Sequence, residues 1–381
     1  MRKKIKVLII QGYAYQRGGP VTFLRHLVKH LDRSKFEPIV LFLSEGELVA
    51  EFQSMGVKVR VINSGKLSNV ILTAITVFRI LRLIYKERID IVLSNDWREH
   101  IYGGTAAYFA GIPATIFLQG FPVLSLPAKL SLAVPATSIF ADSSPLERTI
   151  SQWVKQKCKT YLVYHGIEIP NIKEKASLRE ELDFDADVPI ITQVASLMQW
   201  KGHKYLINAV PKVIKYFPTA KFIIIGDAPF DSVSHRSYAS FESYKESLKQ
   251  LVKNLGIESS IEFMGYRENF LEIIGASDIV VHPSVYEPLA FVVIEALGYG
   301  KPVITTNAGG IKEIIENGVD GILIPPKNSG AIAEAIINLL KNPALCEKLG
   351  VRARKKVEKI FRVEREISEL EDIWQSVLHT P

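Results

Sequence analysis

The sequence predicts an α/β protein made of two doubly wound domains, each a parallel sheet covered by helices. Its 381 residues, 48% of them apolar, exceed what one ordinary domain holds. Short runs rich in Val and Ile alternate with helix-like segments along the whole chain, which is typical of βαβ units. A charged stretch flanked by prolines, EIPNIKEKASLREELDFDADVP, separates these runs into two sets. We therefore expect two domains facing one another across a cleft.

The runs give the order of the expected strands. The first set is KIKVLII, EPIVLFL, VKVRVI, IDIVLSN, ATIFLQG, TSIFADSS and KTYLVYHG. The second set is VPIITQVAS, AKFIIIGDAP, SIEFMGY, SDIVVHPS and KPVITT. We expect the domains to span 1–168 and 186–362, with a linker at 169–185, and the amphipathic pattern alone does not assign the last helix, within 363–381. Ligands of open α/β sheets bind beyond the carboxyl ends of the strands, so candidate site residues are sought there.

Charge and cysteine content narrow the class of protein. Residues 1–165 hold 22 Lys and Arg against 11 Asp and Glu, within a chain of net charge +7. Such a basic half favours an anionic partner, but no stretch interleaves aromatic and basic residues as base-reading motifs do, so we expect no nucleic acid. Cys158 and Cys346 lie far apart without metal-ligand spacing, which indicates neither a disulfide framework nor a zinc site and favours a reducing, cytoplasmic setting. The apolar run after the basic N-terminus is too short for a signal peptide.

The most hydrophobic helix-like segment covers residues 66–88. Leu67 to Phe78 is an uncharged run of 12 residues, about 18 Å of helix, which cannot cross a hydrocarbon core of about 30 Å. Arg79, Arg82 and Lys86 follow at i, i+3 and i+7 and form one basic stripe beside an apolar face. Two interpretations stay open: a domain helix with a solvated basic face, or a helix lying on an anionic membrane surface.

Two glycine-containing turns are candidate phosphate contacts. Gly18 and Gly19 follow the first expected strand and precede a helix opening near Val21, where backbone N–H groups and the helix dipole favour an anion. Lys201, before Gly202, heads a helix in the second domain and supplies a point charge. Neither turn matches GxGxxG or Walker A, which argues against a nicotinamide dehydrogenase and a P-loop enzyme. Taken in isolation, the two features are better explained by a simple turn and a solvated lysine.

HPSVYEPLAFVVIEALGYGKPVIT, residues 282–305, places Glu287 and Glu295 eight positions apart at the edge of an apolar helix pattern. A helix starting near Leu289 would leave free N–H groups at its amino end, between the two carboxylates. A nucleotide sugar fits this spacing, because its diphosphate would rest on the helix end while hydroxyls on either side meet one carboxylate each. Two surface glutamates flanking a core helix is the alternative.

A resemblance to a known family goes further. GIEIPN, ASLMQWKG, IIIGDAP, EFMGY and the stretch from ASDIVVHPS to GILIPP resemble the carboxyl-terminal domain of glycosyltransferase family 4, retaining enzymes of the GT-B fold. Their order and spacing match across about 200 residues, and the glycine turn near the N-terminus extends the resemblance to nearly the whole chain. The resemblance implies two Rossmann-like domains and returns the last helix, 363–381, to the first of them.

The resemblance also assigns roles to residues. It implies that Glu295 binds the ribose hydroxyls, that Glu287 contacts the donor sugar, and that Lys201 neutralises the departing diphosphate. Gly19, with Gly18, would close over the same diphosphate. Backbone N–H groups on the second domain would come from Leu289, Ala290 and Phe291. The family requires no metal ion, so no cofactor is expected.

Three positions depart from the family pattern. Ser196 stands where an arginine is frequent, Gln119 where a histidine near the reaction centre is usual, and Ala290 where a glycine is usual. These positions bear on the donor and on activity. Arg17 is a candidate replacement for the missing charge.

Asn95 and Asp96 end the fourth expected strand and are candidate acceptor contacts, with turn capping as the alternative. Together the residues predict a retaining glycosyltransferase that uses a UDP- or GDP-sugar and a hydroxyl acceptor that is lipid-linked, a polysaccharide or a small molecule. We expect it in the cytoplasm, with an anionic membrane surface as a further candidate partner. Another GT-B activity, or a relative that binds the donor without transfer, are the alternatives.

Overall fold

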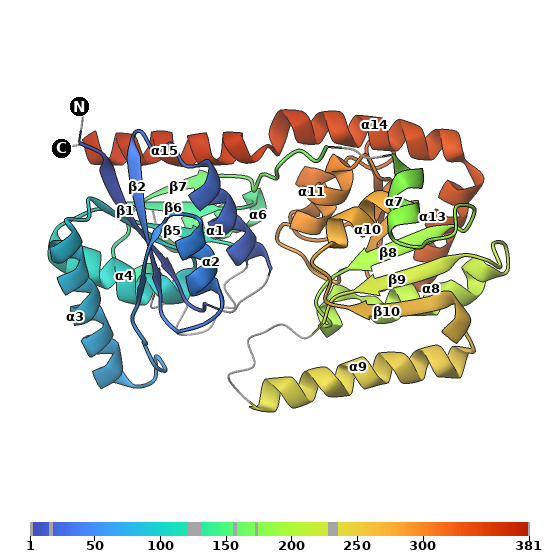
Figure 1. The fold of residues 1–381 in the computed structure, drawn as a ribbon, viewed down its shortest axis with the longest axis horizontal. Helices are drawn as coiled ribbons and strands as arrows, with labels where there is room; N and C mark the ends of the chain where they lie inside the picture. Colours follow the sequence, from blue (N-terminus) through green and yellow to red (C-terminus); the bar gives the residue numbers. More distant parts are fainter. Residues whose placement is uncertain are drawn as a thin grey trace. The chain divides into compact units, whose positions relative to one another are not determined.

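The computed structural model describes residues 3–14, 18–120, 131–154, 158–171, 174–227 and 235–379, with the backbone alone for 235–240. The chain forms two compact units, Met1–His165 with Val363–Pro381, and Gly166–Arg362 (Figure 1). Each unit has one parallel sheet with helices on both faces. The predicted fold class, two doubly wound α/β domains, is confirmed.

The first unit is built on a sheet of order β3-β2-β1-β4-β5-β6-β7. Its strands are β1 (Ile5–Gln11), β2 (Phe36–Phe42), β3 (Lys58–Val61), β4 (Ile91–Ser94), β5 (Ala114–Leu118), β6 (Ser138–Ala141) and β7 (Lys159–Leu162). Central strands of a parallel sheet are covered on both faces, which explains the unbroken apolar runs in the sequence. In β1, for example, the four residues from Val7 to Ile10 are all fully buried.

Helices cover both faces of this sheet. They are α1 (Gly19–His30), α2 (Leu48–Ser54), α3 (Val70–Glu87), α4 (Trp97–Ala110), α6 (Ser144–Val154) and α15 (Val363–His379). Strand β5 shows the division, since its side chains alternate between faces. Ile116 packs with the core under α6, whereas Phe117 makes an edge-to-face contact with Phe23 of α1 at 4.5 Å.

Helix α15 packs beside α1 on the first unit (Figure 1). Trp374 is fully buried and its indole N–H donates to Thr115 Oγ1 of β5 at 3.3 Å. Glu371 accepts a hydrogen bond from the backbone of Asp32 at 2.7 Å, and Glu366 lies 2.8 Å from His165 Nδ1. These contacts join the last residues of the chain to three separate segments of the first unit.

The second unit has a sheet of order β10-β9-β8-β11-β12-β13. Its strands are β8 (Ile190–Val194), β9 (Lys221–Ile225), β10 (Ile261–Gly265), β11 (Ile279–His282), β12 (Val303–Thr306) and β13 (Ile322–Ile324). Its helices are α7 (Lys175–Glu181), η1 (Gln199–Lys201), α8 (His203–Ile214), α9 (His235–Leu255), η2 (Glu258–Ser260), α10 (Phe270–Ala276), α11 (Phe291–Gly298), α12 (Ile311–Ile314), α13 (Ser329–Lys341) and α14 (Pro343–Ile360). The three-residue β13 is an addition to the strands expected from sequence.

The strand order reverses once in each sheet, between β1 and β4 and between β8 and β11. Helices that leave on opposite faces at such a point open a crevice beyond the carboxyl ends of the strands. In this chain the segments after β1, β4 and β5, and those after β8 and β11, carry the polar residues singled out from sequence. The topology therefore gathers them at one edge of each sheet.

Candidate active site

Glu287 is the centre of a buried polar cluster in the second unit. It lies in the loop between β11 and α11 and is only 4% exposed. Its Oε2 atom accepts from Lys201 Nζ at 2.6 Å and from Ser284 Oγ at 3.0 Å, and lies 2.9 Å from His282 Nε2. We call these four residues the Glu287 cluster. Among the described residues all three side-chain contacts go to Oε2, which leaves Oε1 able to accept from a ligand hydroxyl.

The cluster fixes the charges of its members. Burial by itself would raise the pKa of Glu287, but the Lys201 charge and the hydrogen bond from His282 outweigh it and lower the pKa to about 2. Burial also lowers the pKa of His282, so the imidazole is neutral and donates through Nε2. Glu287 is therefore a carboxylate at neutral pH, paired with the Lys201 side chain.

Lys201 is held in place through its backbone. It ends the 3-10 turn η1 after β8, and its carbonyl oxygen accepts from Gln193 Nε2 at 3.0 Å. Gly202 has a φ of 77°, and a Cβ there would lie 2.0 Å from the carbonyl oxygen of Pro283. Only glycine therefore lets this turn approach the segment after β11. The ammonium also lies 4.0 Å from the centre of the Trp200 ring, a cation–π contact.

Helix α11 begins at Phe291, two residues later than the sequence suggests, with Ala290 as its N-cap. Leu289 and Ala290 are buried, at 7% and 4% exposure, directly before the first helical turn. Glu295 lies one turn along α11. Its Oε2 is buried and has no hydrogen-bond partner among the described residues, and burial raises its pKa to about 7. Buried side-chain oxygens are normally hydrogen-bonded, so Glu295 Oε2 is a candidate ligand contact.

Ser196 follows β8 in the loop that leads to Lys201 and is half-buried. The loop after β9 packs against it, since a Cβ on Gly226 would lie 2.0 Å from the carbonyl oxygen of Ala195. The structure therefore brings Ser196 to the same edge of the sheet as Lys201 and Glu287.

A chain of side-chain amides joins three strand ends in the first unit. Asn95, 1% exposed after β4, donates from Nδ2 to Gln11 Oε1 at 2.6 Å and to the Pro20 carbonyl oxygen at 2.9 Å. Gln119, after β5, donates from Nε2 to Asn95 Oδ1 at 2.5 Å. Gln119 Oε1 is buried and has no partner within the described residues. We call Gln11, Asn95 and Gln119 the amide chain.

The glycine turn lies beside the amide chain. Gly18, with a φ of 115°, is the N-cap of α1, and Gly19 is its first residue. Helix α1 therefore begins two residues earlier than expected, and Pro20, whose carbonyl oxygen binds Asn95, lies in its first turn. Arg17, the candidate replacement for a missing charge, lies outside the described residues.

Asp96 caps helix α4, its side chain accepting from the Trp97 backbone at 2.7 Å. Glu99, three residues on and 5% exposed, lies so close to Gly12 that a Cβ there would be 2.0 Å from Glu99 Oε1. Burial raises the pKa of both carboxyl groups, and the Asp96 charge raises that of Glu99 further. Capping, one of the two roles considered for Asp96, is observed.

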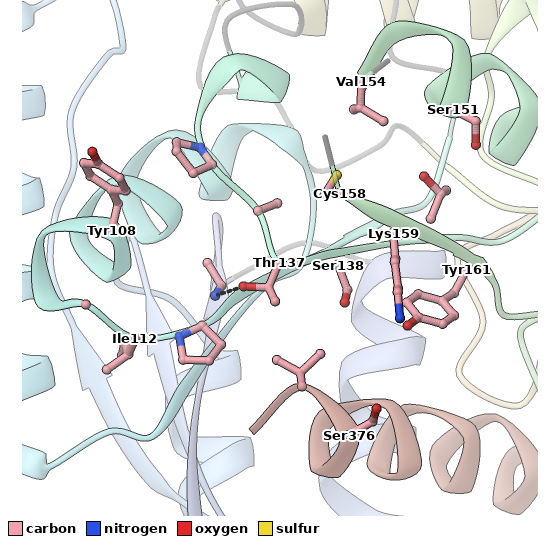
Figure 2. Close-up of a pocket in the computed structure, with 17 residues that line it drawn as sticks. Tyr108, Ile112, Thr137, Ser138, Ser151, Val154, Cys158, Lys159, Tyr161 and Ser376 are labelled. Carbon is pink, nitrogen blue, oxygen red and sulfur yellow. Dashed lines mark hydrogen bonds between the residues drawn. The ribbon is translucent and has the colours of Figure 1, made fainter. Parts of the chain in front are cut away.

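A separate cavity of about 950 Å³ opens at the other edge of the first sheet. It is lined by Ala114, Ser138 and Lys159, the first residues of β5, β6 and β7, with Ser376 of α15 (Figure 2). Gln119 follows the last residue of β5 and so lies at the opposite edge. This cavity is therefore distinct from the crevice that the strand order creates.

The sequence did not single out His282, Ser284 or Gln11. Each lies at or just beyond the carboxyl end of a buried strand, and His282 is the one ionisable residue in an otherwise apolar strand. A polar residue at that position was the available signal. What it contacts depends on tertiary structure.

Solved structures share this fold across almost the whole chain. A structure from Anabaena, Alr3699/HepE in complex with UDP-glucose, superposes with a TM-score of 0.82 at 23% identity, covering 98% of this chain and 100% of that one. A glycosyltransferase from Rickettsia africae ESF-5 gives 0.85 at 21% identity, covering 99% and 100%. The fold is that of the GT-B glycosyltransferases.

Sequence families agree with the fold. "Glycosyltransferase Family 4" matches residues 17–169 and "Glycosyl transferases group 1" matches residues 174–356. Together the two models cover most of the chain, and the chain belongs to the GT-B glycosyltransferases, as its resemblance to family 4 predicted.

Curated relatives carry transferase and synthase names. An uncharacterized glycosyltransferase from Methanocaldococcus jannaschii is 25% identical over 71% of both chains. The Escherichia coli UDP-Gal:alpha-D-GlcNAc-diphosphoundecaprenol alpha-1,3-galactosyltransferase is 22% identical over 77% of both. N-acetyl-alpha-D-glucosaminyl L-malate synthase of Bacillus anthracis is 30% identical over 54% of this chain and 50% of its own.

Proposed function

We propose that the protein is a retaining glycosyltransferase that moves a sugar from a nucleotide diphosphate to an acceptor hydroxyl. The observation that carries the proposal is the pairing of the Glu287 cluster with Glu295 around the amino end of α11. Lys201 offers an ammonium group and the amino end of α11 offers backbone N–H groups, and both suit phosphate oxygens. Glu287 and Glu295 each offer a carboxyl oxygen that can accept from a hydroxyl group. A sugar, a diphosphate and a ribose present these groups in that order.

In this proposal Lys201 and the amino end of α11 stabilise the leaving diphosphate. An ammonium group has three donors, so Lys201 can keep Glu287 on one and offer the others to phosphate oxygens. Backbone N–H groups of Leu289, Ala290 and Phe291 and the helix dipole would add to this stabilisation. We propose that these groups serve in place of a metal ion.

We propose a same-face reaction, because a retaining transfer without an assigned nucleophile calls for attack from the side of the leaving group. The bond from the anomeric carbon to the phosphate oxygen breaks, the acceptor oxygen bonds to that carbon from the same side, and its proton passes to the departing phosphate oxygen. Glu287 Oε1 is the acceptor that we assign to a hydroxyl of the transferred sugar, and Gln119 Oε1 of the first unit is assigned to a substrate hydroxyl. Glu295 is assigned to the ribose.

UDP-sugars are the donors that we propose to test first, with GDP-sugars second. Support comes from similar proteins alone: the Anabaena structure is titled as a complex with UDP-glucose, and the Escherichia coli relative is named for UDP-Gal. The acceptor classes that we propose are a lipid-linked glycan, a polysaccharide and a small molecule.

A donor hydrolysis and transfer screen with UDP- and GDP-sugars tests the proposal. Lys201→Ala and Glu295→Ala should lose most turnover while staying folded. Lys212→Ala is the matched control, since Lys212 pairs with Glu334 on the exposed surface of α8 and α13. Site variants as active as the wild type would refute the site. UDP binding by calorimetry with no turnover on any acceptor would instead identify a protein that binds the donor without transfer.

A further inference from the structure

Helix α3 exposes large apolar side chains along its first half. Val70, Ile71 and Phe78 are 77%, 72% and 65% exposed, and Leu72 and Ile75 are also exposed. Contiguous exposed apolar residues on one element mark an interaction surface. Helix α3 lies beside α4 in the first unit (Figure 1).

The exposed face is the helix face opposite the core. Ile80, Leu83 and Ile84 are buried in the core shared with β1, β2 and α4. On the opposite side Ile71, Ile75 and Phe78 follow at i, i+4 and i+7, the spacing of one helical stripe. These side chains therefore do not contribute to the core of the first unit, and the core does not explain why they are apolar.

The second half of the same face is basic. Arg79, Arg82 and Lys86 are all exposed, and none forms a side-chain hydrogen bond or ion pair within the described residues. Glu87, the one acidic residue of α3, is buried and bound to Lys58 and Arg60 at the other side of the helix. No acidic side chain of α3 therefore offsets the three positive charges on its exposed face.

We propose that this face, Val70–Lys86, docks on an anionic membrane surface, with Val70–Phe78 at the boundary of the acyl chains and the basic residues against lipid phosphates. A bilayer surface presents an apolar acyl layer next to a layer of negative phosphates. Helix α3 presents apolar side chains in its first half and basic side chains in its second half, which match these two layers. No helix within the described residues is long and apolar enough to span the bilayer, so α3 would lie in the interface. A second copy of the chain is a poorer match, because pairing two such faces would cover the basic side chains of both copies with no acidic side chain of α3 facing them.

The place of α3 in the fold connects the surface to the site. Helix α3 starts after β3, at the carboxyl edge of the sheet that also carries Asn95 and Gln119. Arg98 of α4 donates to the carbonyl oxygen of Gly65, before α3, at 3.4 Å and lies 4.7 Å from the centre of the Tyr13 ring. Docking would hold this edge near the lipids, which favours the lipid-linked acceptor; that last step rests on the proposed function, whereas docking does not.

Cosedimentation of the full chain with vesicles tests the proposal. We expect binding to vesicles of equal parts phosphatidylglycerol and phosphatidylcholine at low salt, weaker binding at high salt, and little binding to phosphatidylcholine alone. Arg79→Glu with Arg82→Glu should lower partitioning by at least about 30-fold, because each basic residue at an anionic surface contributes roughly fivefold. Ile71→Glu with Phe78→Glu should also abolish binding, although it leaves every basic residue in place.

The control is Lys348→Glu with Arg352→Glu, at two exposed residues of α14. It changes the net charge by the same amount as Arg79→Glu with Arg82→Glu and should bind vesicles as the wild type does. UDP binding by calorimetry, expected to be unchanged in all variants, reports that each is folded and tests the donor site separately. The proposal is overturned if the wild type does not sediment at low salt, or if the α14 variant loses binding as much as the α3 variants. It is equally overturned if the wild type is a dimer that Phe78→Glu converts to a monomer, since the face would then be a contact between copies.

Discussion

The Glu287 cluster and the amide chain occupy equivalent places in their two sheets but are built from side chains of different charge. Both follow strands at the point where the strand order reverses. The first holds a carboxylate paired with an ammonium group, and the second holds neutral amides alone. Charges suit a diphosphate, which the second unit is proposed to bind. Neutral amides suit hydroxyl groups, whose recognition depends on direction more than on charge.

The two regions share one feature. Each leaves a buried oxygen that has no hydrogen-bond partner within the part of the chain that the structure describes, Glu295 Oε2 near the cluster and Gln119 Oε1 in the amide chain. Because buried acceptors are normally hydrogen-bonded, these two oxygens are where ligand hydroxyls are expected. The comparison yields four predictions. They test in turn the charge of Lys201, the orientation that Asn95 gives to Gln119, the burial of Glu295, and the space beside Ala290.

Removing the charge should have the largest effect. Lys201→Ala should lower kcat for transfer by about 100-fold to 1,000-fold, the usual loss when one preorganised donor to a transition state is removed. It also leaves the Glu287 carboxylate buried without its ion-pair partner, which should destabilise the fold by about 3 to 5 kcal/mol. Steady-state kinetics and denaturant unfolding measure the two effects.

The double variant Lys201→Ala with Glu287→Gln separates them. A neutral amide at 287 removes the buried charge, so stability should largely return while activity stays lost. Recovery of activity together with stability would show that Lys201 acts only by holding the fold.

Breaking the amide chain should have the next largest effect. Asn95→Ala removes the hydrogen bonds that Asn95 makes with Gln11 Oε1 and Gln119 Nε2, at a cost of about 1 to 3 kcal/mol in the free energy of unfolding. We expect kcat to fall by about 10-fold to 100-fold, because Gln119 loses its fixed orientation. Calorimetry should show UDP binding unchanged, since the nucleotide is assigned to the second unit.

Asn254→Ala is the matched control, because Asn254 accepts from Gln250 on the exposed surface of α9. A change within about 0.5 kcal/mol is expected there. If Asn95→Ala weakens UDP binding as much as it lowers kcat, the division of roles between the two units is wrong.

Sequence patterns predicted these two regions unequally. Lys201, Glu287 and Glu295 lie within local motifs of the second domain, and the structure brings the first two into direct contact. Gln11, Asn95 and Gln119 meet only because β1, β4 and β5 are neighbours in the sheet, and Gln11 and Asn95 are 84 residues apart. Periodicity in one sequence carries no information on such a contact.

Local sequence patterns also fail to reveal very short strands. Seven apolar runs of the first domain predicted its seven strands, because buried parallel strands are continuous apolar segments. Strand β13 was not predicted from sequence. It has only three residues, Ile322–Ile324, between Gly321 and Pro325, and a run of this length shows no periodicity. Its pairing with β12 is what makes it a strand.

The burial of Glu295 predicts a pH-dependent stability. Its pKa is about 7 in the folded protein against 4.5 in an unfolded chain, so the native state holds a proton that the unfolded state releases between these values. This contribution to stability therefore falls as pH rises from about 4.5 to 7, by up to about 3 kcal/mol, and stays low above 7. Glu295→Gln should raise the Tm at pH 8 and leave it nearly unchanged at pH 4.5.

The same variant should weaken UDP binding, because an amide offers one acceptor oxygen to the ribose where a carboxylate offers two. Thermal unfolding with and without UDP measures both effects. An equal change in Tm at both pH values would contradict the assignment of the shift to the buried carboxyl group.

Space beside the two carboxylates should matter least for stability and most for selectivity. Ala290 is the N-cap of α11, lies between Glu287 and Glu295 in sequence, and is 4% exposed. Glycine is a better N-cap than alanine, so Ala290→Gly should change the free energy of unfolding by less than about 1 kcal/mol. Removing its methyl group enlarges the space before α11, and a difference of one such group in a pocket changes kcat/KM by about 10-fold or more. Competition between two UDP-sugars of different size should therefore shift toward the larger, whereas an unchanged ratio would place Ala290 away from the transferred sugar.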